Sequence, residues 1–81
     1  MDSGVALIFD SHTRRRMRQR GITEEIVRAV LGNYDEEYRR DEGRTEYWGD
    51  YERRRLLVVL EGETEPYLVV TVIDQERAER R

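Results

Sequence analysis

The chain of 81 residues is long enough for one small domain with a single modest core. It contains no cysteine, which excludes a disulfide framework, a thiol nucleophile and a thiolate metal site. The net charge is −3 although 41% of the residues are charged, which disfavours a protein that coats nucleic acid non-specifically.

The apolar residues are concentrated in short runs, which is typical of a folded domain rather than of a disordered chain. We therefore expect a single domain over residues 1–81, with an ordered core over about residues 5–73 and a charged tail over residues 74–81. No apolar run approaches the roughly 20 residues that a membrane-spanning helix needs. We expect a cytoplasmic protein with no membrane partner.

The first predicted elements are a short strand and a helix. Strand-forming side chains over residues 4–9 predict the strand. Ser11 then follows as the expected N-cap of a helix over residues 12–20, because its hydroxyl can accept from the free amides of the first turn. Gly21 is expected to end this helix, since glycine favours the left-handed conformation found at helix ends.

A second helix is predicted to begin after Thr23 and to stop at Gly32. Thr23 is the expected N-cap, and the acidic Glu24 and Glu25 suit the positive end of the helix dipole. Arg28 lies opposite a broad apolar face that is formed by Ile26, Val27, Val30 and Leu31. This face is expected to pack in the core.

Residues 33–43 are polar and acidic and predict a connecting loop, with room for a short edge strand near Tyr38. Three further strands are predicted, over about residues 44–49, 54–60 and 67–73. Short turns join them, which is typical of an antiparallel meander. We therefore expect an α+β fold in the order β-α-α-β-β-β, with two N-terminal helices on one face of a mainly antiparallel sheet.

Charge is distributed unevenly along the chain. Residues 11–20 carry five arginines and no acid, whereas residues 34–52 carry eight acidic residues against three arginines. All fifteen basic residues are arginine, whose planar guanidinium suits bidentate contacts with phosphate or carboxylate. The arginines of the first helix are therefore candidates either for binding an anion or for pairing with the acidic segment of the same chain.

Helical spacing aligns His12, Arg16 and Arg20 along one ridge of the first helix. At about 100° per residue, these positions lie within about 80° of one another. Thr13 and Met17 lie next to them, on the side that we expect to pack on the core. Arginine side chains at such a border can lay their methylene groups on apolar surface and hold the guanidinium in place.

The segment FDSHTRRRMRQRGIT resembles the start of a bacterial family named domain of unknown function 4258. The pattern of that family is a serine followed by His-Ala-x-x-Arg-Met-x-x-Arg-Gly-Ile-Ser. Thr13 and Thr23 stand where the family usually has alanine and serine. Six positions match the pattern: His12, Arg16, Met17, Arg20, Gly21 and Ile22.

The resemblance covers about residues 7–73, including the aromatic pair Tyr47-Trp48 and the strand LVVTVI with Thr71. Tyr34 departs from the family, which often has proline there. The family is grouped with the RelE/ParE and BrnT-type toxin folds, whose helices-on-a-sheet layout agrees with the expected order. The resemblance thus implies a ribonuclease toxin that acts on RNA and has an antitoxin protein as its partner.

Metal-independent RNA cleavage needs a base for the 2′-hydroxyl, cations for the phosphorane charge and an acid for the leaving oxygen. We expect His12 to be the base, and Arg16 and Arg20 to stabilise the charge, as the catalytic residues. The residue that acts as the acid is not assigned, and the candidates are Tyr47, Tyr51 and Tyr67. With one histidine, no cysteine and no glycine-rich phosphate loop, we expect no metal and no cofactor.

Four further residues are expected to bind RNA: Arg15, Tyr47, Trp48 and Thr71. The rings of Tyr47 and Trp48 can stack on a base, although packing in the core is the plainer role for one of them.

Two functions follow as hypotheses. One is a RelE/BrnT-like toxin-type domain that binds RNA and, if it is an enzyme, acts as a metal-independent endoribonuclease. The alternative is a non-catalytic protein-interaction module whose arginine-rich helix binds an acidic partner. The overall acidity of the chain and the missing acid catalyst favour the alternative.

Overall fold

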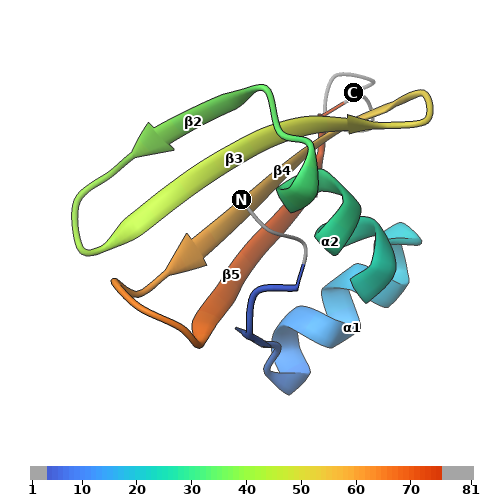
Figure 1. Cartoon of the computed structure of the whole chain (residues 1–81). Coiled ribbons are helices and arrows are strands. Elements are labelled where there is room, and N and C mark those ends of the chain that lie inside the picture. Colours follow the sequence, from blue (N-terminus) through green and yellow to red (C-terminus); the bar gives the residue numbers. More distant parts are fainter. Residues whose placement is uncertain (1–3, 76–81) are drawn as a thin grey trace.

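The computed structural model describes residues 4–75 and has two helices on one face of a five-stranded sheet (Figure 1). Neither helix in this part of the chain is long and apolar enough to span a bilayer. The elements in chain order are β1 (Leu7–Ile8), α1 (Ser11–Arg20), α2 (Glu24–Gly32), β2 (Glu36–Arg39), β3 (Arg44–Tyr51), β4 (Arg54–Glu61) and β5 (Tyr67–Asp74). The predicted α+β class and helix placement are confirmed, with β2 as an additional strand after the helices.

The strands lie in the order β1-β5-β4-β3-β2, so β1 forms one edge of the sheet and β2 forms the other. Strands β2 to β5 form antiparallel pairs, whereas β1 runs parallel to the first residues of β5, with Leu7 opposite Tyr67. Helix α1 lies beside β5, and β2 forms the opposite edge (Figure 1). The basic helix and the acidic strand are thus separated by the width of the sheet.

Strand boundaries differ from the sequence-based predictions in four strands, of which β4 ends at Glu61, one residue later than predicted. The strand expected over residues 4–9 is reduced to Leu7–Ile8, because the chain turns into α1 directly afterwards. Strand β3 continues to Tyr51, since a tight turn pairs that residue with Arg54 of β4. Strand β5 includes Asp74, so the predicted start of the charged tail at residue 74 is wrong. Residues 76–81 of the expected tail lie outside the described part of the chain.

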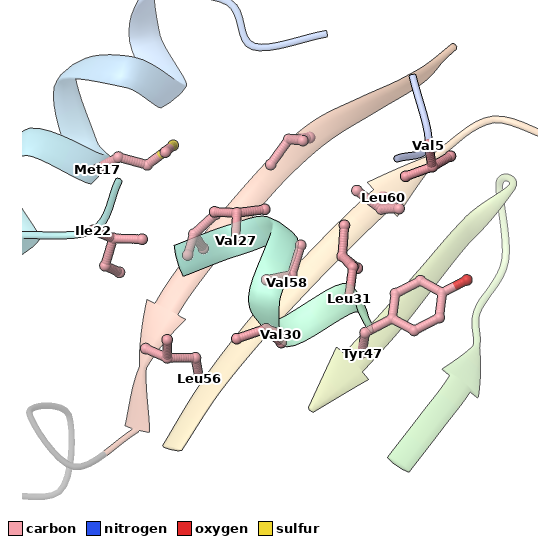
Figure 2. Packing of buried hydrophobic residues seen from close by; sticks show 12 residues of the cluster. Val5, Met17, Ile22, Val27, Val30, Leu31, Tyr47, Leu56, Val58 and Leu60 are labelled. Atoms are coloured by element: carbon pink, nitrogen blue, oxygen red, sulfur yellow. The ribbon is translucent and has the colours of Figure 1, made fainter. Parts of the chain in front are cut away.

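The core lies between α2 and the sheet (Figure 2). The predicted apolar face of α2 is largely confirmed, because Val27, Val30 and Leu31 are fully buried and Ile26 packs at the border. They meet the alternate residues Leu56, Val58 and Leu60 of β4. Burial of each such side chain stabilises the fold by about 1.5–3 kcal/mol.

A β-bulge interrupts the pairing of β4 with β5. Val59 lies opposite Thr71 and Leu60 opposite Val69, which leaves Val70 as an extra residue in β5. A bulge of this kind changes the face of the sheet to which the following side chains point. As a result both Val69 and Val72 join the core although they are three positions apart.

Gly49 of β3 lets α2 approach the sheet closely. A Cβ atom at this position would lie 3.1 Å from Cγ1 of Val30 and 3.3 Å from Cα of Tyr34. The second contact is to backbone, which cannot move as freely as the end of a side chain. Glycine is therefore required here by space rather than by an unusual backbone angle.

Replacing Gly49 with alanine should lower the free energy of unfolding by about 1–3 kcal/mol, because the added methyl group overpacks the contact between α2 and β3. Urea denaturation followed by circular dichroism measures the loss. In a Val30→Ala background the loss should be smaller, since the closest side-chain atom is absent. Equal losses in the two backgrounds would contradict this packing.

Candidate functional site

Helix α1 begins one residue earlier than predicted. Asp10, not Ser11, is its N-cap, with Oδ1 accepting a hydrogen bond from the Thr13 amide at 2.8 Å. This hydrogen bond holds the pKa of the Asp10 carboxyl below its usual value. Gly21 ends the helix with a φ of 68°, in the left-handed conformation that was predicted.

Two hydrogen bonds attach α1 to the outer edge of β5. The Thr13 hydroxyl donates to the Val69 carbonyl at 3.2 Å, and Nη1 of Arg20 donates to the Val72 carbonyl at 2.8 Å. Thr13 and Met17 are buried, as the helical spacing predicted. Since these contacts lie at both ends of the helix, its orientation along β5 is well defined.

His12, Arg16 and Arg20 line one pocket between α1 and β5, with a volume of about 190 Å³. Thr71 of β5 lies on its other side. The remaining lining residues are Thr13, Met17, Val70, Val72 and Ile73. No carboxylate of the described residues lines this pocket, so its charged groups are guanidinium groups, with the imidazole of His12 beside them.

The positive charge of α1 is largely unneutralised. Within residues 4–75, Arg15, Arg16 and Arg18 form no ion pair, and all three side chains are exposed. Arg14 differs, because its guanidinium lies 5.0 Å from the centre of the Phe9 ring and 3.9 Å from Glu24. Of these three arginines Arg16 lines the pocket, so an anion that enters it meets a guanidinium group without an ion-pair partner among the described residues, which favours phosphate or carboxylate.

The acidic segment pairs with arginines that lie outside α1. Arg55 of β4 contacts Asp35 and Glu36, each at 2.6 Å, and hydrogen bonds from Arg55 hold the pKa of the Asp35 carboxyl below its usual value. Arg40 pairs with Glu46 at 3.0 Å. Internal pairing of Arg16 or Arg20 with the acidic segment, which the sequence left open, does not occur among residues 4–75.

The aromatic residues expected to bind RNA do not lie at this pocket. Tyr47 is buried in the core (Figure 2). Its ring contacts that of Tyr34 edge to face at 4.9 Å, and burial raises the pKa of its hydroxyl. Trp48 lies on the opposite face of the sheet, with the guanidinium of Arg55 5.9 Å from its ring centre. Arg15 belongs to α1 but does not line the pocket.

The three tyrosines that were candidates for the acid are also absent from the pocket lining. Tyr51 and Tyr67 pack against the core cluster, to which Tyr47 belongs. Thr71 is thus the one member of the expected RNA-binding set, Arg15, Tyr47, Trp48 and Thr71, that the described structure brings to the pocket.

Arg54 is a positioning residue that the sequence-based reasoning missed. Its guanidinium donates to the carbonyls of Arg20 at 3.0 Å and Gly21 at 3.1 Å, and to the carboxylate of Asp74 at 2.9 Å. The last carbonyls of a helix have no partner within the helix, so a donor there fixes its end. The need for a donor could be foreseen, but the donor comes from 33 residues further along the chain.

Replacing Arg54 with methionine should lower the free energy of unfolding by about 2 kcal/mol, because two helix-end carbonyls and the largely buried Asp74 lose a charged donor. Chemical denaturation measures the loss. Adding Asp74→Leu should recover part of it, since no carboxylate then faces the vacated position. A double variant that is no more stable than Arg54→Met would contradict this role of Arg54.

Comparison with known proteins identifies a family. The family model described as Domain of unknown function (DUF4258) matches residues 9–74, which include α1, its pocket and the whole of β5. No curated protein and no solved structure matches the chain. Over residues 4–75, no group of three or more His, Asp or Glu side chains is placed to hold a metal ion.

Proposed function

The chain belongs to the DUF4258 family, and on this premise we propose that it is an RNA-binding domain of the RelE/BrnT toxin type. The observation that carries the proposal is the lining of the α1 pocket. One imidazole and two guanidinium groups, from His12, Arg16 and Arg20, meet there without a carboxylate among the described lining residues. Such a toxin acts in the cytoplasm and is neutralised by an antitoxin protein.

A phosphodiester fits this set of groups. Guanidinium groups bind phosphate oxygens through parallel, charge-assisted hydrogen bonds, and Arg16 is exposed and makes no ion pair with the rest of the described chain. Arg20 is held in place by its bond to the Val72 carbonyl, which leaves its other N–H groups for a ligand. The pair therefore combines an adaptable cation with a fixed one.

His12 supplies the additional group that cleavage requires. Its imidazole accepts the proton of the 2′-hydroxyl, the 2′-oxygen bonds to phosphorus, and the bond from phosphorus to the 5′-oxygen breaks. Arg16 and Arg20 neutralise the charge that develops on the phosphorus oxygens. Water protonates the leaving oxygen, because no tyrosine or carboxylate of the described chain lines the pocket. We therefore expect slow cleavage.

Arg16→Ala should weaken binding of a short single-stranded RNA by roughly tenfold, because a charge-assisted contact with phosphate is lost. The slope of log K against log salt should fall by about 0.7, which corresponds to one phosphate contact. Fluorescence anisotropy over a series of salt concentrations measures both quantities.

Arg44→Ala is the matched control for this experiment, since it removes an exposed arginine in β3. If this control weakens binding as much as Arg16→Ala, the contact is not specific to the pocket. If the unmodified protein does not bind RNA, the proposed function is wrong.

His12→Gln should leave RNA affinity nearly unchanged and reduce cleavage by about 10²–10⁴-fold, because a general base is lost while the arginines remain. Product analysis in the presence of a chelator should show 2′,3′-cyclic phosphate and 5′-hydroxyl ends. Inducible expression of the unmodified protein in bacteria should arrest growth, and the variant should relieve the arrest. If RNA stays intact and growth is normal, the protein does not cleave RNA and its proposed function is reduced to RNA binding.

A second function is favoured by the exposed side of α1. Arg15 and Arg18 point away from the pocket lining and form no ion pair among residues 4–75. A cationic surface of this kind also suits an acidic protein, and an antitoxin would be such a partner. In that case Arg15→Ala and Arg18→Ala weaken the protein complex, while no variant of α1 affects RNA.

A further inference from the structure

Strand β2 forms an exposed edge of the sheet. Its four residues, Glu36–Arg39, are all exposed, and within residues 4–75 it pairs with β3 on one side and with no strand on the other. The free backbone groups of an edge strand can pair with a strand from another chain. Figure 1 shows β2 on the side of the sheet away from α1.

The outward-facing backbone groups of β2 can be assigned from its hairpin. The Arg40 amide donates to the Arg44 carbonyl at 2.7 Å, so Arg40 directs its backbone groups toward β3. Because the hydrogen-bonding direction alternates along an antiparallel strand, Glu37 and Arg39 direct theirs to the free edge. A strand that pairs with β2 must therefore bond to these two residues.

We propose that β2 pairs with β2 of a second copy of this chain, in antiparallel orientation about a two-fold axis perpendicular to the sheet. Such an axis keeps the two helix-bearing faces on the same side of the joined sheet. Residues that lie opposite each other then point to the same face, so even positions oppose even positions and odd positions oppose odd ones.

Among the registers in which even positions oppose even ones, the side-chain charges of β2 favour one. With Tyr38 opposite the partner's Tyr38, Glu37 lies opposite the partner's Arg39 and Glu36 opposite the partner's Arg40. Cross-strand pairs of opposite charge stabilise a sheet, whereas like charges directly opposite each other destabilise it. Other registers place Glu37 opposite the partner's Glu37, or Arg39 opposite the partner's Arg39. The order Glu-Glu-Tyr-Arg-Arg is thus complementary to itself about its tyrosine.

At the centre of this register the Arg39 side chain is exposed and the Glu37 side chain is partly exposed. The Arg39 side chain is 85% exposed, and its ion pair with Glu37 of the same strand is long, at 3.5 Å. Glu37 also accepts from the Tyr34 hydroxyl at 3.1 Å, which leaves capacity on its carboxylate. Glu36 and Arg40 already pair with Arg55 and Glu46, so they contribute less to the dimer.

The joined sheet leaves both pockets free. Each α1 lies at the β5 edge, across its own sheet from the dimer axis (Figure 1). A pair of four-residue strands buries far less than the roughly 1,600 Å² of a standard interface, so we expect a weak dimer that depends on protein concentration. Failure of the dimer would not affect the proposed RNA function.

Tyr38→Cys tests the register directly, because the chain contains no other cysteine. In the proposed dimer, position 38 forms a pair without backbone hydrogen bonds, with Cα atoms about 4.5 Å apart, which a disulfide can span. Mild oxidation should therefore give a disulfide-linked dimer, as seen on a non-reducing gel, in a yield that rises with protein concentration.

Glu36→Cys is the matched control on the same face of β2. Its two copies would be offset by roughly 13 Å along the strands, too far for a disulfide. Equal cross-linking at positions 36 and 38 would indicate random collision and would overturn the proposal. Preferential cross-linking of Glu37→Cys would overturn the proposed register.

Charge reversal gives a test without cross-linking. Glu37→Arg and Arg39→Glu each place like charges opposite each other, and each should raise the dimer dissociation constant at least about tenfold in sedimentation equilibrium. A mixture of the two variants restores opposite charges and should form a heterodimer. The double variant within one chain should dimerise like the unmodified protein.

An unmodified protein that stays monomeric up to about 1 mM would overturn the proposal, and so would failure of the mixture to associate. RNA binding by all these variants should be unchanged, because β2 does not line the α1 pocket.

Discussion

The attachment of α1 to the outer edge of β5 is the constraint on which the candidate site depends. β1 pairs with the first residues of β5, and beyond them hydrogen bonds from Thr13 and Arg20 occupy backbone carbonyls of this edge. The helix therefore protects an edge that would otherwise be open to other strands. The same contacts place the ridge of His12 and Arg16 beside β5, so one arrangement supports both the fold and the pocket.

The separation of charge across the sheet explains why the pocket stays cationic. The acidic residues next to β2 are neutralised by Arg40 and Arg55, which lie on the same side of the molecule. Because α1 is at the opposite edge, its arginines have no described carboxylate partner apart from that of Arg14. A chain with a net charge of −3 can thus keep a locally positive binding surface.

Helix ends and periodicity were largely predictable because they depend on neighbours within a few residues. Thr23 and Gly21 have their predicted capping roles, and Thr13 and Met17 face the core as their spacing indicated. The prediction of Ser11 as the N-cap of α1 was wrong because Asp10 and Ser11 are both good capping residues, and the path of the backbone decides between them. The extent of β1 was wrong because strand length depends on a partner that is distant in sequence.

From the sequence by itself came the α+β order, the core face of α2 and the alignment of His12, Arg16 and Arg20, since all three follow from local periodicity and turn residues. Tertiary structure alone decided that β5 lines the pocket and that Arg54 holds the end of α1. It also decided that Tyr47 and Trp48 lie away from the pocket. These features depend on strand order and register. Both result from packing of the whole chain, which local propensity does not determine.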